Sequence, residues 1–200
     1  MTKLKKNKIA FFGHPGSFTH GAAIAFVNEY SIVPELELPC ESIKEVIDFA
    51  SQDGYFGVVP IKNSLAGDVE DFKHISPDVL EGLSLIEEVT MPIHHCLLVR
   101  KEVSSLDDIT HVVSHRQALK QCGNFIANHD LQVFYYSNTS TAARALSQGK
   151  IPKEYGIIAS EDAARIYGLN ILLKNLEDAE DNKTTFRIYA NQPLQEHDVS

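Results

Sequence analysis

Short apolar runs alternate with segments of helical character along most of the chain. A continuous apolar run such as residues 55–61 is typical of a strand that is buried on both faces of a parallel sheet. Most of the helical segments begin near a serine or threonine, which can cap a helix. Strands are expected at residues 8–12, 36–38, 55–61, 83–89, 93–99, 111–114, 133–136, 156–160 and 171–173, and helices at 22–26, 42–50, 114–129, 140–146 and 161–167. This alternation predicts an α/β fold.

The last expected strand follows an acidic loop. Residues 177–181 read EDAED, which predicts a solvated loop, and residues 182–189 run from a polar turn into an alternating apolar strand. Thr184 offers a hydroxyl that can donate a proton or accept a hydrogen bond, and Phe186 supplies an apolar face. Taken alone, this stretch is more typical of an ordinary edge strand that is entered by a polar loop.

The length, charge and cysteine content of the chain argue against several classes of protein. The 200 residues suit one large or two small domains, and no apolar run approaches the roughly 20 residues of a membrane span. The net charge of -9 argues against a nucleic-acid partner. The three cysteines show no CxxC pattern, so the sequence suggests neither a disulfide framework nor a metal site. The basic N-terminus lacks the apolar stretch of a signal peptide, so we expect a cytoplasmic protein.

Polar residues gather where the expected strands end. In open α/β sheets, ligands bind outside the carboxyl ends of strands, so Asn63 and Ser64 are candidates for holding a small molecule or for capping the next helix. Ser17 or Thr19 can cap a helix after a Gly-rich turn, where free N–H groups suit an anion. That turn lacks the spacing of GxGxxG and of a P-loop, which excludes nucleotide binding.

Further hydroxyls lie in the second half of the chain. Ser114 can cap the helix that follows it, and Ser140 and Thr141 form a hydroxyl pair at another helix start. The chain has no G-x-S-x-G elbow, and Ser114 and His115 are sequence neighbours, which does not make a nucleophile and base pair. A serine hydrolase is therefore disfavoured.

Six sequence blocks occur in a distinctive order. They are PGSFTH at 15–20, VPIKNS at 59–64, SHRQAL at 114–119, STAA at 140–143, YGL at 167–169 and NKTTF at 182–186. In this order the chain resembles the prephenate dehydratase family from about Lys8 to Ala190. The resemblance implies two α/β subdomains in a periplasmic-binding-protein-like (type II) arrangement with an interdomain cleft. The implied divisions are a flexible N-terminal arm at 1–7, a first subdomain at 8–88 plus 174–192, a second at 89–173, and a tail at 193–200.

The resemblance also implies a reaction that needs no cofactor. A carbon–oxygen lyase of this family converts prephenate to phenylpyruvate, water and carbon dioxide in phenylalanine biosynthesis. By similarity, Thr184 would donate to the leaving hydroxyl. The substrate contacts would come from Ser17, Thr19, Asn63, Ser64, Ser114, Gln121, Ser140, Thr141 and Phe186.

Three positions depart from the family pattern. Thr185 replaces the usual arginine of Thr-Arg-Phe, Lys62 replaces a glutamate, and Arg116 replaces a proline. A charge-assisted hydrogen bond is worth roughly 1.5 to 3 kcal/mol, so its uncompensated loss would cost about one to two orders of magnitude in transition-state binding. Our hypothesis is that Lys62 or Arg116 supplies the missing positive charge.

The resemblance also leads to expectations about feedback by phenylalanine and about the oligomeric state. Many family members carry a C-terminal ACT domain that binds phenylalanine, and a sequence ending at Ser200 leaves no room for one, so we expect no phenylalanine feedback within this polypeptide. A homodimer or higher homo-oligomer is expected by analogy. The alternatives are a divergent prephenate decarboxylase and a non-catalytic small-anion binding protein. Retention of Thr184 and Phe186 favours dehydration.

Overall fold

The computed structural model describes residues 7–193, so most of the expected N-terminal arm and C-terminal tail lies outside the described residues. The chain forms two compact units, which confirms the expected α/β class with two subdomains. In the described chain, unit 1 comprises residues 7–14, 18–92 and 183–193, and unit 2 comprises residues 15–17 and 93–182. Within residues 7–193, no helix has the length and apolar character needed to cross a membrane.

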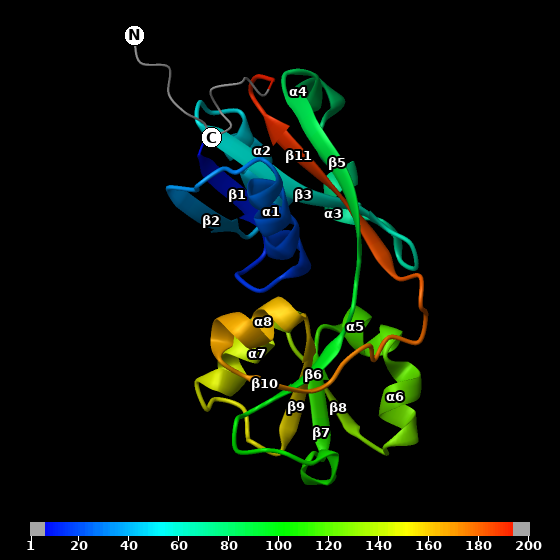
Figure 1. The fold of residues 1–200 in the computed structure, drawn as a ribbon. Coiled ribbons are helices and arrows are strands. Elements are labelled where there is room, and N and C mark those ends of the chain that lie inside the picture. The colour runs from blue at the N-terminus through cyan, green and yellow to red at the C-terminus, as the bar shows by residue number, and fades with distance from the viewer. Residues whose placement is uncertain (1–6, 194–200) are drawn as a thin grey trace. The chain divides into compact units, whose positions relative to one another are not determined.

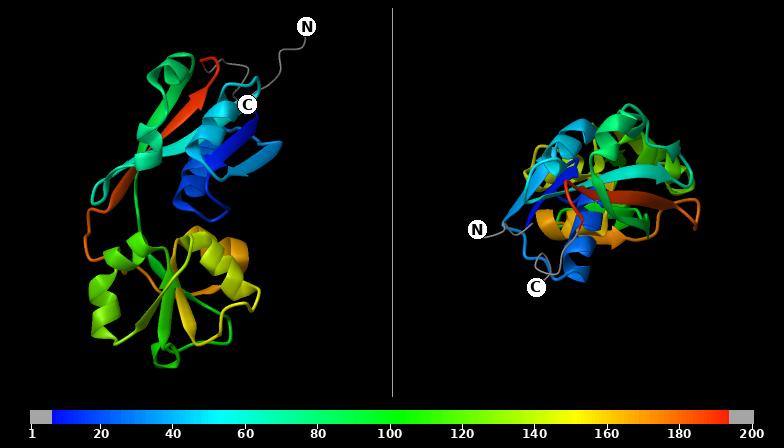
Figure 2. Two further views of the ribbon diagram at one scale, coloured as in Figure 1. Left: turned by 180° about the vertical axis from the view of Figure 1, so that it is seen from behind. Right: turned by 90° about the horizontal axis from the view of Figure 1, so that it is seen from above.

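Unit 1 is built on a mixed sheet whose strand order is β2-β1-β3-β11-β5, with the short strand β4 paired to β3. The strands are β1 (Lys8–Phe12), β2 (Leu36–Cys40), β3 (Tyr55–Asn63), β4 (Gly67–Asp68), β5 (Ser84–Pro92) and β11 (Lys183–Ala190). β1 runs parallel to β2 and β3, whereas β11 is antiparallel to both of its neighbours. Figures 1 and 2 show β11, coloured orange to red, beside β3 and β5. The last strand of the described residues is therefore an interior strand of this sheet, and not the edge strand that its sequence alone suggests.

Among residues 7–193, four helices belong to unit 1: α1 (Phe18–Glu29), α2 (Ile43–Ala50), α3 (Glu70–Lys73) and α4 (Pro77–Glu81). The buried face of α2 packs on Val59 and Tyr189, and a Cβ at Gly57 would lie 2.8 Å from the Cβ of Ala50. This close approach requires glycine at that strand position.

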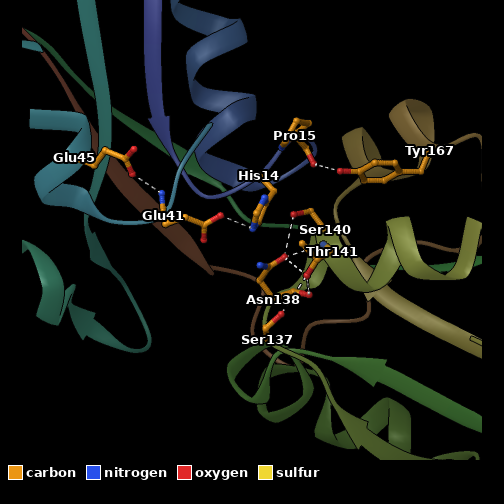
Figure 3. Close-up of polar contacts among 9 residues, drawn as sticks. All are labelled: His14, Pro15, Glu41, Glu45, Ser137, Asn138, Ser140, Thr141 and Tyr167. Atoms are coloured by element: carbon orange, nitrogen blue, oxygen red, sulfur yellow. Dashed lines mark hydrogen bonds and ion pairs between the residues drawn. The ribbon is translucent and has the colours of Figure 1, made fainter. Parts of the chain in front are cut away.

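Ser42 caps α2 as the sequence predicts. Its Oγ accepts a hydrogen bond from the backbone N–H of Glu45 at 3.2 Å. The Glu45 carboxylate accepts in turn from the N–H of Glu41 at 2.9 Å (Figure 3). In a capping box this return bond would come from the N–H of Ser42, so here it falls one residue earlier.

Unit 2 is built on a five-stranded sheet of order β10-β6-β9-β7-β8. Its strands are β6 (Cys96–Val99), β7 (His111–Ser114), β8 (Gln132–Tyr135), β9 (Tyr155–Ala159) and β10 (Asn170–Leu173). Its helices are the 3-10 turn Leu106–Asp108, α5 (Arg116–Gln121), α6 (Gly123–Asn128), α7 (Thr139–Ser147) and α8 (Glu161–Tyr167). Figure 1 shows α7 and α8 on one face of the sheet and α5 and α6 on the other. Each face has its own apolar core, as expected of a sheet that is covered on both sides.

The structure corrects three local expectations. The helix expected at 114–129 is two helices, because the chain breaks at Cys122 (φ −116°, ψ 29°). Ser114 ends β7, and the cap of α5 is His115, whose side chain accepts from the N–H of Gln117 at 3.3 Å. The strand expected at 93–99 begins only at Cys96.

The boundaries between the units also differ from those expected at residues 88 and 173. β5 pairs with β11 as far as Pro92 opposite Lys183, so the first crossing lies after Pro92. Residues 174–182 belong to unit 2, where Glu177 contacts His94 and the backbone of His95. Residues 15–17 also belong to unit 2, which the sequence did not indicate.

Candidate functional site

Thr184 lies at the start of β11, beside the end of β3. The strand register pairs it with Asn63 on β3 and with Met91 on β5. The Nδ2 of Asn63 donates to the Oγ1 of Thr184 at 3.0 Å and to the backbone carbonyl of Lys183 at 3.0 Å. Asn63 is itself 8% exposed, so its amide is held firmly against the first residues of β11.

The orientation of the Asn63 amide is set by its other end. Its Oδ1 accepts from the backbone N–H groups of Leu65 at 3.1 Å and Ala66 at 2.9 Å, so the NH2 group must face Thr184. The Thr184 oxygen is therefore an acceptor in this contact, and its hydrogen can be donated to another group. Donation from Asn63 also stabilises negative charge on that oxygen, which makes Thr184 a better proton donor.

Ser64 completes the clamp on β11. Its N–H donates to the carbonyl of Lys183 at 2.8 Å, and its Oγ accepts from the N–H of Lys183 at 2.9 Å. Asn63 and Ser64 therefore hold the backbone on the N-terminal side of Thr184. The structure thus brings together three residues predicted for the site, all of them in unit 1.

Lys62 lies directly across the sheet from Thr185, the position where the family pattern expects arginine. The register between β3 and β11 shifts after Thr185, so that Lys62 faces Thr185 while Phe186 faces Pro60. On the other side, the Thr185 hydroxyl lies 2.9 Å from that of Thr90. Directly opposed residues share one face with Cβ atoms roughly 4.5–5.5 Å apart, so the exposed Lys62 side chain starts from the strand next to the missing arginine.

Phe186, which was predicted to contact the substrate, lies in the core of unit 1. Its ring is 1% exposed, and its neighbours in the sheet are Pro60 and Val89. A ring with so little exposed surface serves the core of unit 1, where an aromatic side chain contributes a large buried area.

The predicted hydroxyls of unit 2 are used inside the protein. Ser114 is fully buried, and its Oγ donates to the carbonyl of Ile158 at 2.5 Å. The cap of α7 is Asn138, whose Oδ1 accepts from the N–H of Thr141 at 2.7 Å, from its Oγ1 at 2.7 Å and from the Oγ of Ser140 at 3.2 Å (Figure 3). The hydroxyls of Ser114 and Ser140 therefore hold the chain itself, and substrate contact by these two residues stays a prediction.

Gln121 anchors the return segment of the chain. Its Oε1 lies 2.9 Å from the Nε2 of His95 and accepts from the Nδ2 of Asn182 at 3.3 Å. Burial lowers the pKa of His95, so the ring is neutral. Burial alone would raise the pKa of Glu177, but hydrogen bonds from His94 and from the backbone N–H of His95 lower it. The carboxylate and the neutral ring thus tie residues 177–182 to the body of unit 2.

Residues 15–17 are bound to α8 by two side chains. The hydroxyl of Tyr167 donates to the carbonyl of Pro15 at 2.7 Å, and the Oγ of Ser160 donates to that of Gly16 at 2.6 Å (Figure 3 shows the first contact). Gly16 has φ +81°, and a Cβ there would lie 2.8 Å from the Cα of Ala163. Only glycine suits this position.

Three further predicted residues make other contacts or lie at a helix start. Ser17 directly precedes α1, and Thr19 lies in its first turn, 6% exposed. The exposed Arg116 stacks over Tyr135, with its guanidinium carbon 4.7 Å from the ring centroid.

The described residues suggest neither a metal centre nor a reactive thiol. Residues 7–193 contain no group of three or more His, Cys, Asp or Glu side chains placed to hold a metal ion. All three cysteines are buried, and burial raises the pKa of Cys40 to about 12 and that of Cys96 to about 11. Burial also raises the pKa of Cys122 strongly. None is activated as a nucleophile.

Sequence reasoning missed several residues that shape these contacts. Asn138 stands three residues before Thr141 and could have been recognised as a cap, since asparagine is among the best capping residues. The contacts of Tyr167 and Ser160 with residues 15–17 join positions more than 140 residues apart, and no local signal announces them.

Comparisons with known proteins agree with this architecture. A family model described as "Prephenate dehydratase" matches residues 9–193. The chain is 38% identical to arogenate dehydratase/prephenate dehydratase 1 of Arabidopsis thaliana, over 94% of this chain and 46% of that protein. It spans about half the length of the curated relatives that it matches.

Two solved structures are also similar. The prephenate dehydratase of Staphylococcus aureus superposes with a TM-score of 0.75 at 27% identity, over 94% of this chain and 68% of that one. A protein described as GqqA, a novel type of quorum quenching acylase, superposes with a TM-score of 0.75 at 30% identity, over 94% of this chain and 66% of that one.

Proposed function

The chain belongs to the prephenate dehydratase family, and we propose that it catalyses the decarboxylating elimination of water from prephenate to give phenylpyruvate for aromatic amino-acid biosynthesis. The observation that carries this proposal is the hydrogen bond from the Asn63 amide to the Thr184 oxygen, which leaves the Thr184 hydrogen for a substrate. The overall change takes up one proton and releases one carbon dioxide and one water.

In the proposed reaction, Thr184 assists the leaving hydroxyl of the ring. The ring carbon–oxygen bond breaks as the bond to the carboxylate breaks, and the electron pair of the carboxylate bond restores the aromatic system. The departing oxygen takes a proton from Thr184, which solvent then replaces. Asn63 supports the charge on the Thr184 oxygen at 3.0 Å. Threonine is a weak acid, so positioning of the substrate supplies the rest of the acceleration.

We assign the carboxylate-binding cation to Lys62. It occupies the strand position directly across from Thr185, on the face from which the family arginine would project. Arg116 is less suited, because its guanidinium is already engaged over Tyr135. The predicted substrate contacts remain Ser17, Thr19, Asn63, Ser64, Ser114, Gln121, Ser140, Thr141 and Phe186.

Charge favours prephenate over arogenate as the substrate. Prephenate carries two carboxylates, whereas arogenate carries an ammonium group in addition. A lysine at position 62 attracts the first and repels the added charge of the second. The Arabidopsis relative is named for both activities, so the assay must offer both substrates.

The test is incubation of the purified protein with prephenate or arogenate at neutral pH, with identification of the product. We expect phenylpyruvate from prephenate, and a loss of roughly 100-fold or more in kcat for Thr184→Val, which keeps the shape and removes the hydroxyl. A non-aromatic decarboxylated product would assign the chain as a divergent decarboxylase. Binding of prephenate without turnover would assign it as a small-anion binding protein.

A further inference from the structure

The edge strand β8 carries an unusual set of exposed side chains. Val133, Phe134, Tyr135 and Tyr136 are 36%, 48%, 62% and 37% exposed, although all four are apolar or aromatic. Residues 131–143 contain no charged side chain, in a chain whose net charge is -9. Exposed, uncharged edge strands are sites where another strand pairs.

The other strands that end the two sheets are protected against such pairing. β2 carries Glu37 and Pro39, β5 carries Glu87 and Glu88 and ends in Pro92, and β10 has an irregular register between Ile171 and Leu173. Charges, prolines and bulges are the usual means of blocking an edge. Of these four strands in the described chain, β8 alone has none of them.

The backbone of β8 presents its hydrogen-bonding groups in a defined order. Gln132 donates to Thr110 at 3.1 Å and Tyr136 donates to Ser114 at 2.9 Å, so these two residues face β7. Because backbone groups alternate along a strand, Phe134 also faces β7, whereas Val133 and Tyr135 direct their N–H and C=O groups away from the sheet.

This order is self-complementary. If two β8 strands pair antiparallel about a two-fold axis at Phe134, Val133 of each copy meets Tyr135 of the other, and the four outward N–H and C=O pairs are satisfied. The two Phe134 side chains then meet on the opposite face. Aromatic pairs and pairs of aromatic with β-branched residues are the favoured cross-strand pairs.

The side chains of this edge are already held in place. Phe134 stacks on Tyr155 with centroids 5.6 Å apart, and His111 stacks on the same tyrosine at 4.3 Å. On the other face, Arg116 covers Tyr135. Aromatic residues and arginine are the residues enriched at protein interfaces, and ordering them beforehand lowers the entropy cost of association.

We propose that β8 is a homodimer interface, at which a second copy of this chain extends the sheet of unit 2 across a two-fold axis at Phe134. The partner is a second copy because the hydrogen-bonding order, the side-chain pairing and the lack of charge all match the strand to itself. This inference does not depend on the proposed function.

A register-specific cross-link tests the proposal. In the proposed pairing, the two residues at position 134 have Cα atoms about 4.5 Å apart, which is within the range of a disulfide. We expect Phe134→Cys to form a covalent dimer under mild oxidation. The matched variant Val133→Cys should not, because its two copies lie more than about 7 Å apart. The native cysteines are all buried and do not confuse the result.

Sedimentation equilibrium provides the second measurement. We expect the wild-type protein to sediment at twice the 22.2 kDa chain mass. Phe134→Lys places like charges directly opposite each other and should raise the dimer dissociation constant ~10-fold or more. Val33→Lys, at an apolar residue of unit 1 that is 77% exposed, should leave it unchanged. A monomeric wild type, a dimer insensitive to Phe134→Lys, or a Phe134→Cys variant that stays reduced would each overturn the proposal.

Discussion

The replacement Asn63→Asp tests how the hydroxyl of Thr184 is directed. The aspartate keeps an oxygen that accepts from the N–H groups of Leu65 and Ala66, so the turn after β3 is retained. It lacks the NH2 group that donates to Thr184 and to the carbonyl of Lys183. Next to a carboxylate, Thr184 becomes the donor, and its hydrogen is held by residue 63 instead of being offered to the substrate.

The expected magnitude follows from the bond that must be broken in each turnover. A hydrogen bond to a carboxylate is worth roughly 1.5–3 kcal/mol, which corresponds to a loss of about 10- to 150-fold in kcat. Asn63→Ala removes the donor without creating a competing acceptor, so one neutral bond of roughly 0.5–1.5 kcal/mol is lost and kcat falls only about 2- to 10-fold.

Stability should follow the opposite order. Asn63→Ala loses the four side-chain hydrogen bonds to Thr184, Lys183, Leu65 and Ala66. Asn63→Asp loses only the bond to the carbonyl of Lys183, because Thr184 then donates to the carboxylate. The alanine variant should therefore be the less stable of the two in urea, and the aspartate variant the slower.

The assay is phenylpyruvate formation from prephenate at pH 7.5, with kcat and KM separated and urea midpoints measured in parallel. The kcat value is the deciding readout, because repulsion between the carboxylate introduced by Asn63→Asp and a dianionic substrate acts first on KM. If the alanine variant is both the less stable and the slower, Asn63 supports the fold and does not direct the proton of Thr184.

Other consequences can be measured directly. Lys62→Ala should lower kcat/KM by about 10- to 100-fold through loss of a charge-assisted bond, and an unchanged value would return the role to Arg116. Gly16→Ala should lower the free energy of unfolding by ~1–3 kcal/mol more than Gly67→Ala does. Both glycines have positive φ, but only at Gly16 would the new Cβ meet backbone atoms. Equal effects of the two substitutions on unfolding in urea would contradict this. Folding lowers the pKa of His95. As the pH falls below the ordinary value of 6.5, the unfolded chain therefore binds a proton at this residue before the folded chain does. The free energy of unfolding should therefore fall from pH 6.5 downward by at most about 1.4 kcal/mol per pH unit from this residue, and His95→Asn should flatten that part of the urea-midpoint profile.

The fold class and most elements follow from local patterns in the sequence. Continuous apolar runs such as β3 and the cap at Ser42 act through neighbours within a few residues, so a pattern of residues suffices to locate them. The unit boundaries do not follow in this way. The crossing after Pro92 depends on pairing with Lys183, some ninety positions later, and pairing over such a separation leaves no local trace.

In the candidate site, the sequence allowed us to predict neighbouring residues only where they lie at the ends of paired strands. Asn63 and Thr184 were both expected, and the structure joins them because β3 and β11 are paired. Ser114 and Ser140 were expected on the same grounds, yet their hydroxyls bind the protein itself. A serine at a strand end or helix start can serve the backbone or a ligand, and the choice depends on acceptors such as the carbonyl of Ile158, which only the folded chain brings near.

The interior position of β11 also constrains how the chain is made. Unit 1 begins with β1 but lacks the strand between β3 and β5 until residues 183–190 have been synthesised. On the ribosome, β3 and β5 would therefore expose unpaired edges while the whole of unit 2 emerges. Apart from residues 15–17, unit 2 is continuous in sequence and can fold first. Unit 1 is therefore completed last, when β11 pairs with β3 and β5 and brings Thr184 into the sheet.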